Sequence, residues 1–221
     1  MSTTEPAPAS TPDTTPWLPL SVNARGIYLA AAIDPTNPCY NTAELLECPV
    51  GTNLDTLRQA LRRLYEENEG FRVRTRLHAG RAEQQVLGLD EFLENIEFLE
   101  NIELLPVPEN PHEEEPDSEP VPAMVRAWAS SLIAEPLNPD AGITVRSRVA
   151  FYADRLWVYH SFHHVVADGF AAFNGLSRIA SIYRALSSGH PVPPVSRASL
   201  AELIAADNAA EPARASDYEY W

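Results

Sequence analysis

The feature that most limits the fold is an alternating strand followed closely by a long amphipathic helix. Side chains of residues 155–164 alternate between two faces at the period of a β-strand. One face carries Leu156, Val158, His160, Phe162 and His164, and the other carries Trp157, Tyr159, Ser161 and His163. After Gly169, apolar side chains recur at helical spacing, at Phe173, Leu176, Ala180, Tyr183 and Leu186. The change from a strand period to a helical period predicts an α/β or α+β fold in which the end of a strand meets the start of a helix.

The rest of the chain supplies elements of both kinds. Periodicity and turn residues predict helices at residues 23–33 and 124–135, and strands at residues 40–50 and 143–152. Asn53 is a typical helix cap before a run with Leu54, Leu57, Leu61 and Leu64 on one face. Residues 71–77 and 83–87 are expected to form a hairpin, and a turn at residues 153–154 makes the last two strands a second hairpin.

Charge limits the class of partner. The 221 residues hold 31 acidic side chains and 16 basic ones, all of which are arginine. Thirteen of the acids lie between Glu83 and Glu119, where no basic residue occurs, so the remainder is nearly neutral. Binding to phosphates requires clustered cations, which excludes nucleic acid and anionic membranes as expected partners. Small molecules and proteins remain as the expected classes of partner.

Cysteine usage and hydropathy bear on location. Only Cys39 and Cys48 occur, and no basic-then-apolar leader precedes them, so we expect a reducing cytoplasm. The longest apolar stretches are shorter than the ~20 residues that span a bilayer, so no membrane segment is expected.

Two regions are expected to lie outside the packed fold. Residues 1–16 consist of Ser, Thr, Pro and Ala with two acids, which predicts a disordered tail. Residues 91–96 are repeated identically at residues 97–102, and residues 106–122 hold six prolines and six acids. We interpret residues 106–122 as an exposed, solvated loop, in preference to a docking site for a basic partner, and residues 90–122 together as an acidic, Pro-rich insertion.

The junction after the strand carries the candidate chemistry. A neutral imidazole from His163 or His164 at a cleft can serve as a general base at neutral pH. Asp168 lies at the helix start, where capping the helix and a catalytic role are about equally supported. If it is buried, Asp168 also requires a cation, which Arg72 or Arg74 can supply.

Residues 163–169 match the HHxxxDG signature of condensation domains from nonribosomal peptide synthetases, which are relatives of chloramphenicol acetyltransferase. Residues 18–28 resemble the opening motif of that family, and residues 69–72 resemble its second motif. Residues 178–183 resemble the helix after the active site, and residues 217–221 resemble the end of the amino-terminal lobe. Asn23-Ala24 departs from the usual Ala-Gln of the opening motif.

The resemblance implies a fold and a place within it. The expected fold is an α/β two-layer sandwich of the chloramphenicol acetyltransferase-like type, a mixed sheet with helices on one side. Residues 17–221 would form the amino-terminal lobe, one of two lobes that make a V-shaped domain with the active site at their junction. Residues 26–29, 37–41 and 168–170 resemble starter-type domains, which begin an assembly line.

The resemblance also implies a reaction. An acyl thioester, carried by a carrier protein or coenzyme A, would be attacked by the amine of an aminoacyl thioester on a second carrier protein, as in lipopeptide biosynthesis. His164 is the expected catalytic residue, either as general base or as a hydrogen-bonding group. Asp168 would pair with Arg72, Gly169 would donate its N–H toward the thioester oxygen, and His163 would hold the loop. No cofactor is expected on this chain; phosphopantetheine belongs to the carrier proteins.

Four alternatives compete with this interpretation. His160, His163, His164 and Asp168 form a potential metal set, but strand geometry separates His163 from the others, so no metal is expected. A stand-alone, trimeric CoA-dependent acyltransferase has a similar length but carries its histidine nearer the carboxyl terminus. A noncatalytic docking lobe for carrier proteins is the third, although such domains tend to lose the motif. Epimerase-type domains usually carry Trp-Arg soon after the Gly, where this chain has residues 170–173.

Overall fold

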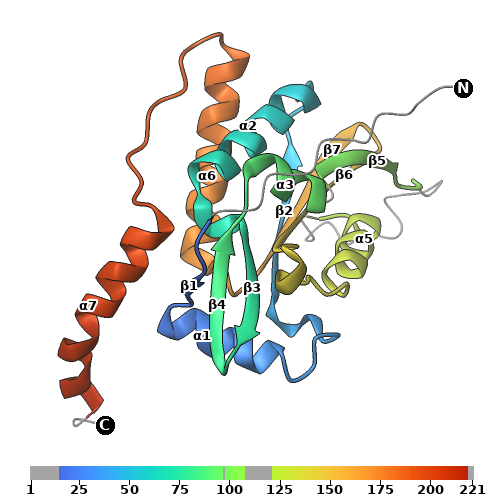
Figure 1. The fold of residues 1–221 in the computed structure, drawn as a ribbon. Helices are drawn as coiled ribbons and strands as arrows, with labels where there is room; N and C mark the ends of the chain where they lie inside the picture. Colours follow the sequence, from blue (N-terminus) through green and yellow to red (C-terminus); the bar gives the residue numbers. More distant parts are fainter. Residues whose placement is uncertain (1–14, 97, 108–120, 219–221) are drawn as a thin grey trace, which may run out of the picture.

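A computed structural model describes residues 15–96, 98–107 and 121–218. The predicted tail at residues 1–14 and most of the predicted Pro-rich loop, residues 108–120, lie outside the described residues. Two β-sheets and the helices packed on them make up the described part (Figure 1). No helix within it is both long enough and apolar enough to cross a membrane.

The larger sheet has four strands in the order β2-β7-β6-β5. Strand β7 (Arg155–His163) lies between β2 (Asn41–Cys48) and β6 (Val145–Tyr152), and it is antiparallel to both. Strand β5 (Phe98–Leu104) runs parallel to β6 at the edge. The sheet is therefore mixed, as expected, and the strands predicted near residues 40–50, 143–152 and 155–163 are confirmed.

The smaller sheet has three strands in the order β1-β4-β3. The predicted hairpin is formed by β3 (Val73–His78) and β4 (Arg81–Val86), and β1 (Leu18–Pro19) pairs with β4. Its two-residue turn has φ of 49° at Ala79 and 74° at Gly80. Two consecutive positive φ angles are the geometry that matches the twist of a tight hairpin.

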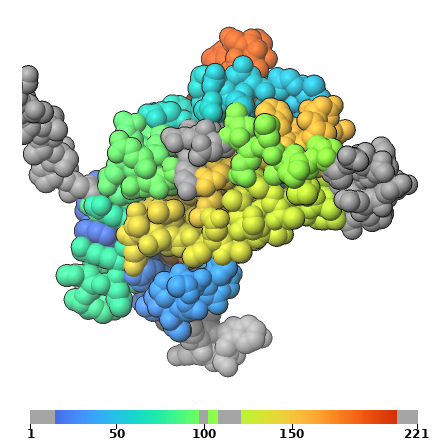
Figure 2. Space-filling view, turned by 90° about the vertical axis from the view of Figure 1, so that its right-hand side faces the viewer, coloured from blue at the N-terminus to red at the C-terminus, as the bar shows by residue number. Residues whose placement is uncertain are grey.

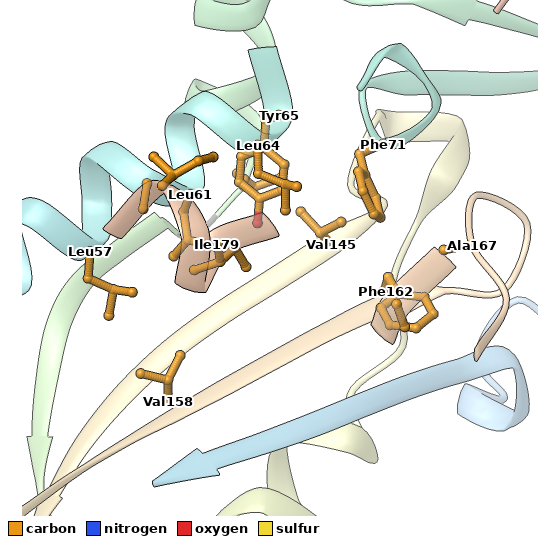
Figure 3. Packing of buried hydrophobic residues seen from close by; sticks show 14 of the residues in the cluster. Leu57, Leu61, Leu64, Tyr65, Phe71, Val145, Val158, Phe162, Ala167 and Ile179 are labelled. Atoms are coloured by element: carbon orange, nitrogen blue, oxygen red, sulfur yellow. The ribbon is translucent and has the colours of Figure 1, made fainter. Parts of the chain in front are cut away.

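Two helices cover one face of the larger sheet. Helix α2 (Leu54–Glu67) begins where Asn53 Oδ1 accepts the N–H of Thr56 at 2.9 Å, as its sequence predicts. Its apolar face meets α6 (Gly169–Ser187) and the sheet. Figure 3 shows this core with side chains from α2, α6, β6 and β7, among them Leu57, Leu61, Leu64, Ile179, Val145, Val158 and Phe162.

The opposite face of the sheet is also covered. Helix α5 (Ala123–Ile133) packs Val125, Trp128 and Leu132 against Trp157 and Tyr159. The period-2 pattern of β7 is confirmed, since each of its two faces serves a different apolar cluster. The predicted α/β sandwich is thus confirmed. The expectation that helices cover only one side of the sheet is wrong, because α5 covers the second side.

The two identical hexapeptides adopt different structures. The first copy lies largely in helix α3 (Leu89–Asn95), and the second lies largely in strand β5. Phe92 is fully buried with its ring 5.2 Å from that of Tyr65, and Ile96 is buried as well. Because the sequences are identical, tertiary contacts decide between helix and strand here. Within the predicted insertion, α3 and the residue that follows it thus contribute Phe92 and Ile96 to the core, and β5 pairs with β6.

The remaining helices lie at the periphery. Helix α1 (Val22–Ala31) begins at Ser21, whose hydroxyl oxygen accepts the N–H of Ala24. Helix α7 (Leu200–Tyr218), which was not predicted, runs along the outside of the body (Figure 1). Three short 3-10 helices, η1 (Pro38–Tyr40), η2 (Glu69–Phe71) and η3 (Pro139–Ala141), connect the elements. In Figure 2 the segment around η3 (yellow) lies between the β3–β4 hairpin (green) and the segment around η1 (blue).

Candidate functional site

The candidate site is the turn that joins β7 to α6. Strand β7 ends at His163, and residues 164–166 form the turn before α6 begins at Gly169. His164 therefore directly follows the strand. Its backbone N–H donates to the carbonyl oxygen of Tyr40 at 2.8 Å, directly before β2.

His163 is buried and ties the turn together. Its Nδ1 accepts the N–H of Val165 at 3.1 Å, and its carbonyl oxygen accepts the N–H of Val166 at 3.0 Å. Burial, and secondarily the neighbouring His164, lower the pKa of His163 to about 4. The imidazole is thus neutral near pH 7 with its proton on Nε2, and its contacts are those of a residue that holds the loop.

His164 is only partly buried. Its Nδ1 is inaccessible to solvent and has no hydrogen-bond partner among the described residues. No carboxylate of the described residues orients the ring through that nitrogen, which distinguishes the arrangement from a Ser-His-Asp triad. The chemistry available to His164 therefore depends on its other ring nitrogen, Nε2.

Asp168 caps helix α6 and does not pair with Arg72. Its side chain is exposed, and Oδ1 accepts the N–H of Ala171 at 2.8 Å. The Arg72 guanidinium instead donates to two backbone carbonyls, those of Tyr65 at 2.8 Å and of Leu87. The expected Arg72–Asp168 ion pair is therefore wrong for this structure, because an exposed carboxylate needs no buried cation and Arg72 is held elsewhere.

Gly169 is the first residue of α6 and is exposed. Its φ lies outside the left-handed region, and a Cβ built on it would have no described neighbour within 4 Å. Neither backbone strain nor packing in the described chain therefore requires a glycine here. Close approach by a substrate from outside remains a reason for it.

The three motifs that carry the family resemblance meet at one cavity. A cavity of about 310 Å³ is lined by Ser21 and Ala24 of the opening motif, Gly70 of the second motif, and Val165 and Val166 of the histidine motif. A neighbouring groove of about 830 Å³ is lined by Asp168, by η2 and by the start of α7. Segments far apart in sequence are thus brought together beside the turn that holds His163 and His164.

Two contacts missed by sequence reasoning anchor this region. Glu67 and Arg178 form a buried two-point ion pair of 2.7 and 2.8 Å between α2 and α6, and Arg178 also donates to the Pro193 carbonyl. The hydrogen bonds from Arg178 lower the pKa of the Glu67 carboxyl. The Glu69 carboxylate accepts the N–H of Leu200, which attaches the start of α7 to η2. No spacing rule in the sequence links these pairs.

The four residues of the alternative metal set have other surroundings. His160 Nδ1 lies 2.9 Å from Ser147 Oγ inside the core, and His163 Nδ1 accepts a backbone N–H. Among the residues that the structure describes, no group of three or more His, Cys, Asp or Glu side chains is placed to hold a metal ion.

The fold and the histidine turn define an α/β protein of the chloramphenicol acetyltransferase-like type. Residues 16–221 match the family model of the condensation domain, and the chain belongs to that family.

Two curated relatives are synthetases. The chain is 30% identical over 187 residues to a dimodular nonribosomal peptide synthase of Bacillus subtilis, an alignment that covers 82% of this chain and 7% of the relative. It is 29% identical over 229 residues to an isonitrile lipopeptide synthase of Streptomyces coeruleorubidus, which covers 100% of this chain and 14% of the relative.

Solved structures confirm the fold. A starter condensation domain of rhizomide synthetase in complex with C8-CoA and Leu-SNAC matches with a TM-score of 0.75 at 20% identity, over 93% of this chain and 44% of that one. The first condensation domain of the calcium-dependent antibiotic synthetase, bound to a substrate analogue, matches with a TM-score of 0.70 at 21% identity, over 92% and 45% of the two chains. The chain therefore spans less than half the length of the condensation domain structures it matches.

Proposed function

We propose that this chain is the amino-terminal lobe of a starter-type condensation domain that forms an amide in (lipo)peptide biosynthesis. The observation that carries this is the convergence of three family motifs at the cavity lined by Val165 and Val166, the two residues that follow His163 and His164. The acyl-CoA in the complex of the rhizomide starter domain supports a thioester donor. The length relative to solved domains supports a second lobe as partner.

In the proposed reaction, the amine nitrogen of the acceptor attacks the donor thioester carbon. The new C–N bond replaces the C–S bond, and the proton lost by the amine leaves with the thiol. The donor is an acyl group on a carrier protein or CoA, and the acceptor is an aminoacyl group on a second carrier protein. Phosphopantetheine would arrive with those partners, and the two free cysteines agree with a reducing, cytoplasmic location.

The surroundings of His164 favour a hydrogen-bonding role over that of a general base. A base that accepts a proton at Nε2 carries its own proton on Nδ1, where the described residues offer no acceptor. An unpaired buried polar atom costs about 1–3 kcal/mol when it is neutral and more when it is charged, so an unpaired N–H on the imidazolium that a base becomes costs more than an unpaired nitrogen on the neutral ring. With the proton on Nε2, His164 donates to the substrate, positions it and stabilises the tetrahedral oxyanion.

The neighbouring residues take supporting roles in this proposal. The N–H of Gly169, at the start of α6, is offered to the thioester oxygen. Asp168 fixes that end of the helix through its bond to Ala171, and His163 holds the turn.

The test uses a complete two-lobe domain that contains this chain, with an octanoyl donor and an aminoacyl carrier protein. The intact mass of the acceptor is measured for the unmodified protein, His164→Ala and His190→Ala, the last being an exposed histidine outside the site. We expect the octanoyl mass increase with the unmodified protein and His190→Ala, and its loss with His164→Ala. Retained donor binding without product in any of them would indicate a docking lobe and refute the proposal.

A further inference from the structure

Thr144 connects two of the motifs. It lies directly before β6 and is completely buried. Its hydroxyl donates to the carbonyl oxygen of Phe71, the last residue of η2, at 2.5 Å. Its own carbonyl oxygen accepts the N–H of His163 at 2.8 Å. One buried side chain therefore links the second motif to the histidine motif.

Both ends of this link are fixed. On one side, η2 is held by the Arg72 N–H, which donates to the Glu69 carbonyl at 2.9 Å, and by the N–H of Leu87, which donates to the Arg72 carbonyl at 2.7 Å. Glu69 also receives the N–H of Leu200. η2 is thus a rigid support against which the Thr144 hydroxyl can act.

On the other side, two backbone bonds to residues that directly precede the neighbouring strands hold the end of β7, in addition to the bonds that His163 makes within the turn. The His163 N–H donates to the Thr144 carbonyl, and the His164 N–H donates to the Tyr40 carbonyl, each at 2.8 Å. These two bonds come from opposite neighbours of β7, since Thr144 precedes β6 and Tyr40 precedes β2. The backbone at His163 and His164 is therefore held from both sides of β7, by Thr144 and by Tyr40. Among the described contacts, only Thr144 also bonds η2 through its side chain.

We infer that Thr144 is a positioning residue, whose hydroxyl bond to Phe71 sets the backbone at His163 and thereby the placement of the His164 ring. The inference rests on the proposed function, because it assigns to Thr144 an effect on the reaction of His164. Thr144 does not touch substrate in this account.

The test replaces the hydroxyl without changing the shape of the side chain. Thr144→Val removes the donor to Phe71 and keeps the branched volume, whereas Thr144→Ser keeps the hydroxyl. Thr75→Val is the matched control, because Thr75 is also buried and its hydroxyl also donates a 2.5 Å bond, to Asp140 outside this link. All three are made in the complete two-lobe domain, and the folded fraction is measured by thermal unfolding so that rates refer to folded protein.

The first readout is kinetic. We expect Thr144→Val to lower kcat by roughly ten- to a hundredfold, the range for a reacting group displaced by about an ångström, with little change in KM. Thr144→Ser should recover most of that loss, and Thr75→Val should leave kcat unchanged even if it lowers the melting temperature. An unchanged kcat in folded Thr144→Val would overturn the inference.

The second readout does not require activity. Ring signals of ¹⁵N-labelled histidine report the environment of His164 by NMR. We expect the His164 ring signals to move in Thr144→Val and not in Thr144→Ser or Thr75→Val. If the unmodified protein made no amide, the proposed function would fail, yet these signals would still decide whether Thr144 positions the ring. Unmoved His164 signals in Thr144→Val would refute the link itself.

Discussion

Because His160 is buried, we expect mild acid to lower the free energy of unfolding by an amount that can be calculated. Its imidazole is buried between α2 and the sheet, where Ser147 Oγ lies 2.9 Å from Nδ1 and 3.2 Å from the Tyr65 hydroxyl. Burial lowers the pKa of His160 from 6.5 to about 4. The unfolded chain therefore binds a proton at a pH where the folded chain does not.

The sign and size follow from proton linkage. Because the folded pKa lies below the unfolded one, the stabilisation is complete above pH 6.5 and is lost as the pH falls toward 4. Between pH 7.5 and pH 5.0, these two pKa values give a loss of about 2 kcal/mol from His160 alone. His163, with a similar pKa, adds its own loss.

The assay is urea unfolding of this chain at pH 7.5 and pH 5.0, with His160→Gln as the comparison. Glutamine does not titrate, so the variant retains the contribution of His163 and loses that of His160. We expect the unmodified chain to lose about 2 kcal/mol more than the variant between the two pH values, whatever the variant costs at pH 7.5. Equal losses in the two proteins would refute the reasoning, since they would mean that His160 titrates alike in both states.

Three further changes test the packing, each by urea unfolding at pH 7.5. Leu61→Ala, at a fully buried position in the α2–α6 core, should cost about 2–5 kcal/mol, and a cost below ~1 kcal/mol would contradict the packing described. Glu67→Gln leaves the buried Arg178 cation without its charged partner and should cost about 3–5 kcal/mol, whereas Asp55→Asn, in an exposed pair on the same helix, should cost under ~1 kcal/mol; similar values for both would argue against the buried pair. Asn53→Ala removes the cap of α2 and should cost about 1 kcal/mol, with no loss expected if the cap bond is absent in solution.

Local patterns predict elements well here because they record which face of each element is buried. The alternation in β7 is a good predictor because both of its faces are covered by apolar clusters, and the Asn53 cap and the leucine spacing predict where α2 begins and which of its faces is buried. Helix α7 has a weak apolar face in which Ile204 is buried while Leu203 is exposed, so periodicity gives little sign of it.

The site is less predictable because long-range contacts decide it. The spacing of the histidine motif locates His163, His164 and the capping residue Asp168, since these depend on the local strand, turn and helix. The partner of Arg72 depends on where η2 sits against the Tyr65 and Leu87 carbonyls, and no local rule gives that. The role of Thr144 is equally hard to predict, because a single threonine before a strand forms no recognisable sequence pattern.

The two copies of the repeated hexapeptide, in α3 and in β5, respond differently to a change in length. Side chains of a strand alternate with a period of two, so a shift by six residues returns every side chain to the same face. In a helix, the same shift turns the apolar stripe by about 120° around the axis. The helical copy in α3 is held in place by Phe92 and Ile96 in the core, whereas the other copy lies in the edge strand β5. A gain of six residues in β5 would therefore return each side chain to its face of the sheet, whereas a gain of five or seven residues would place it on the opposite face.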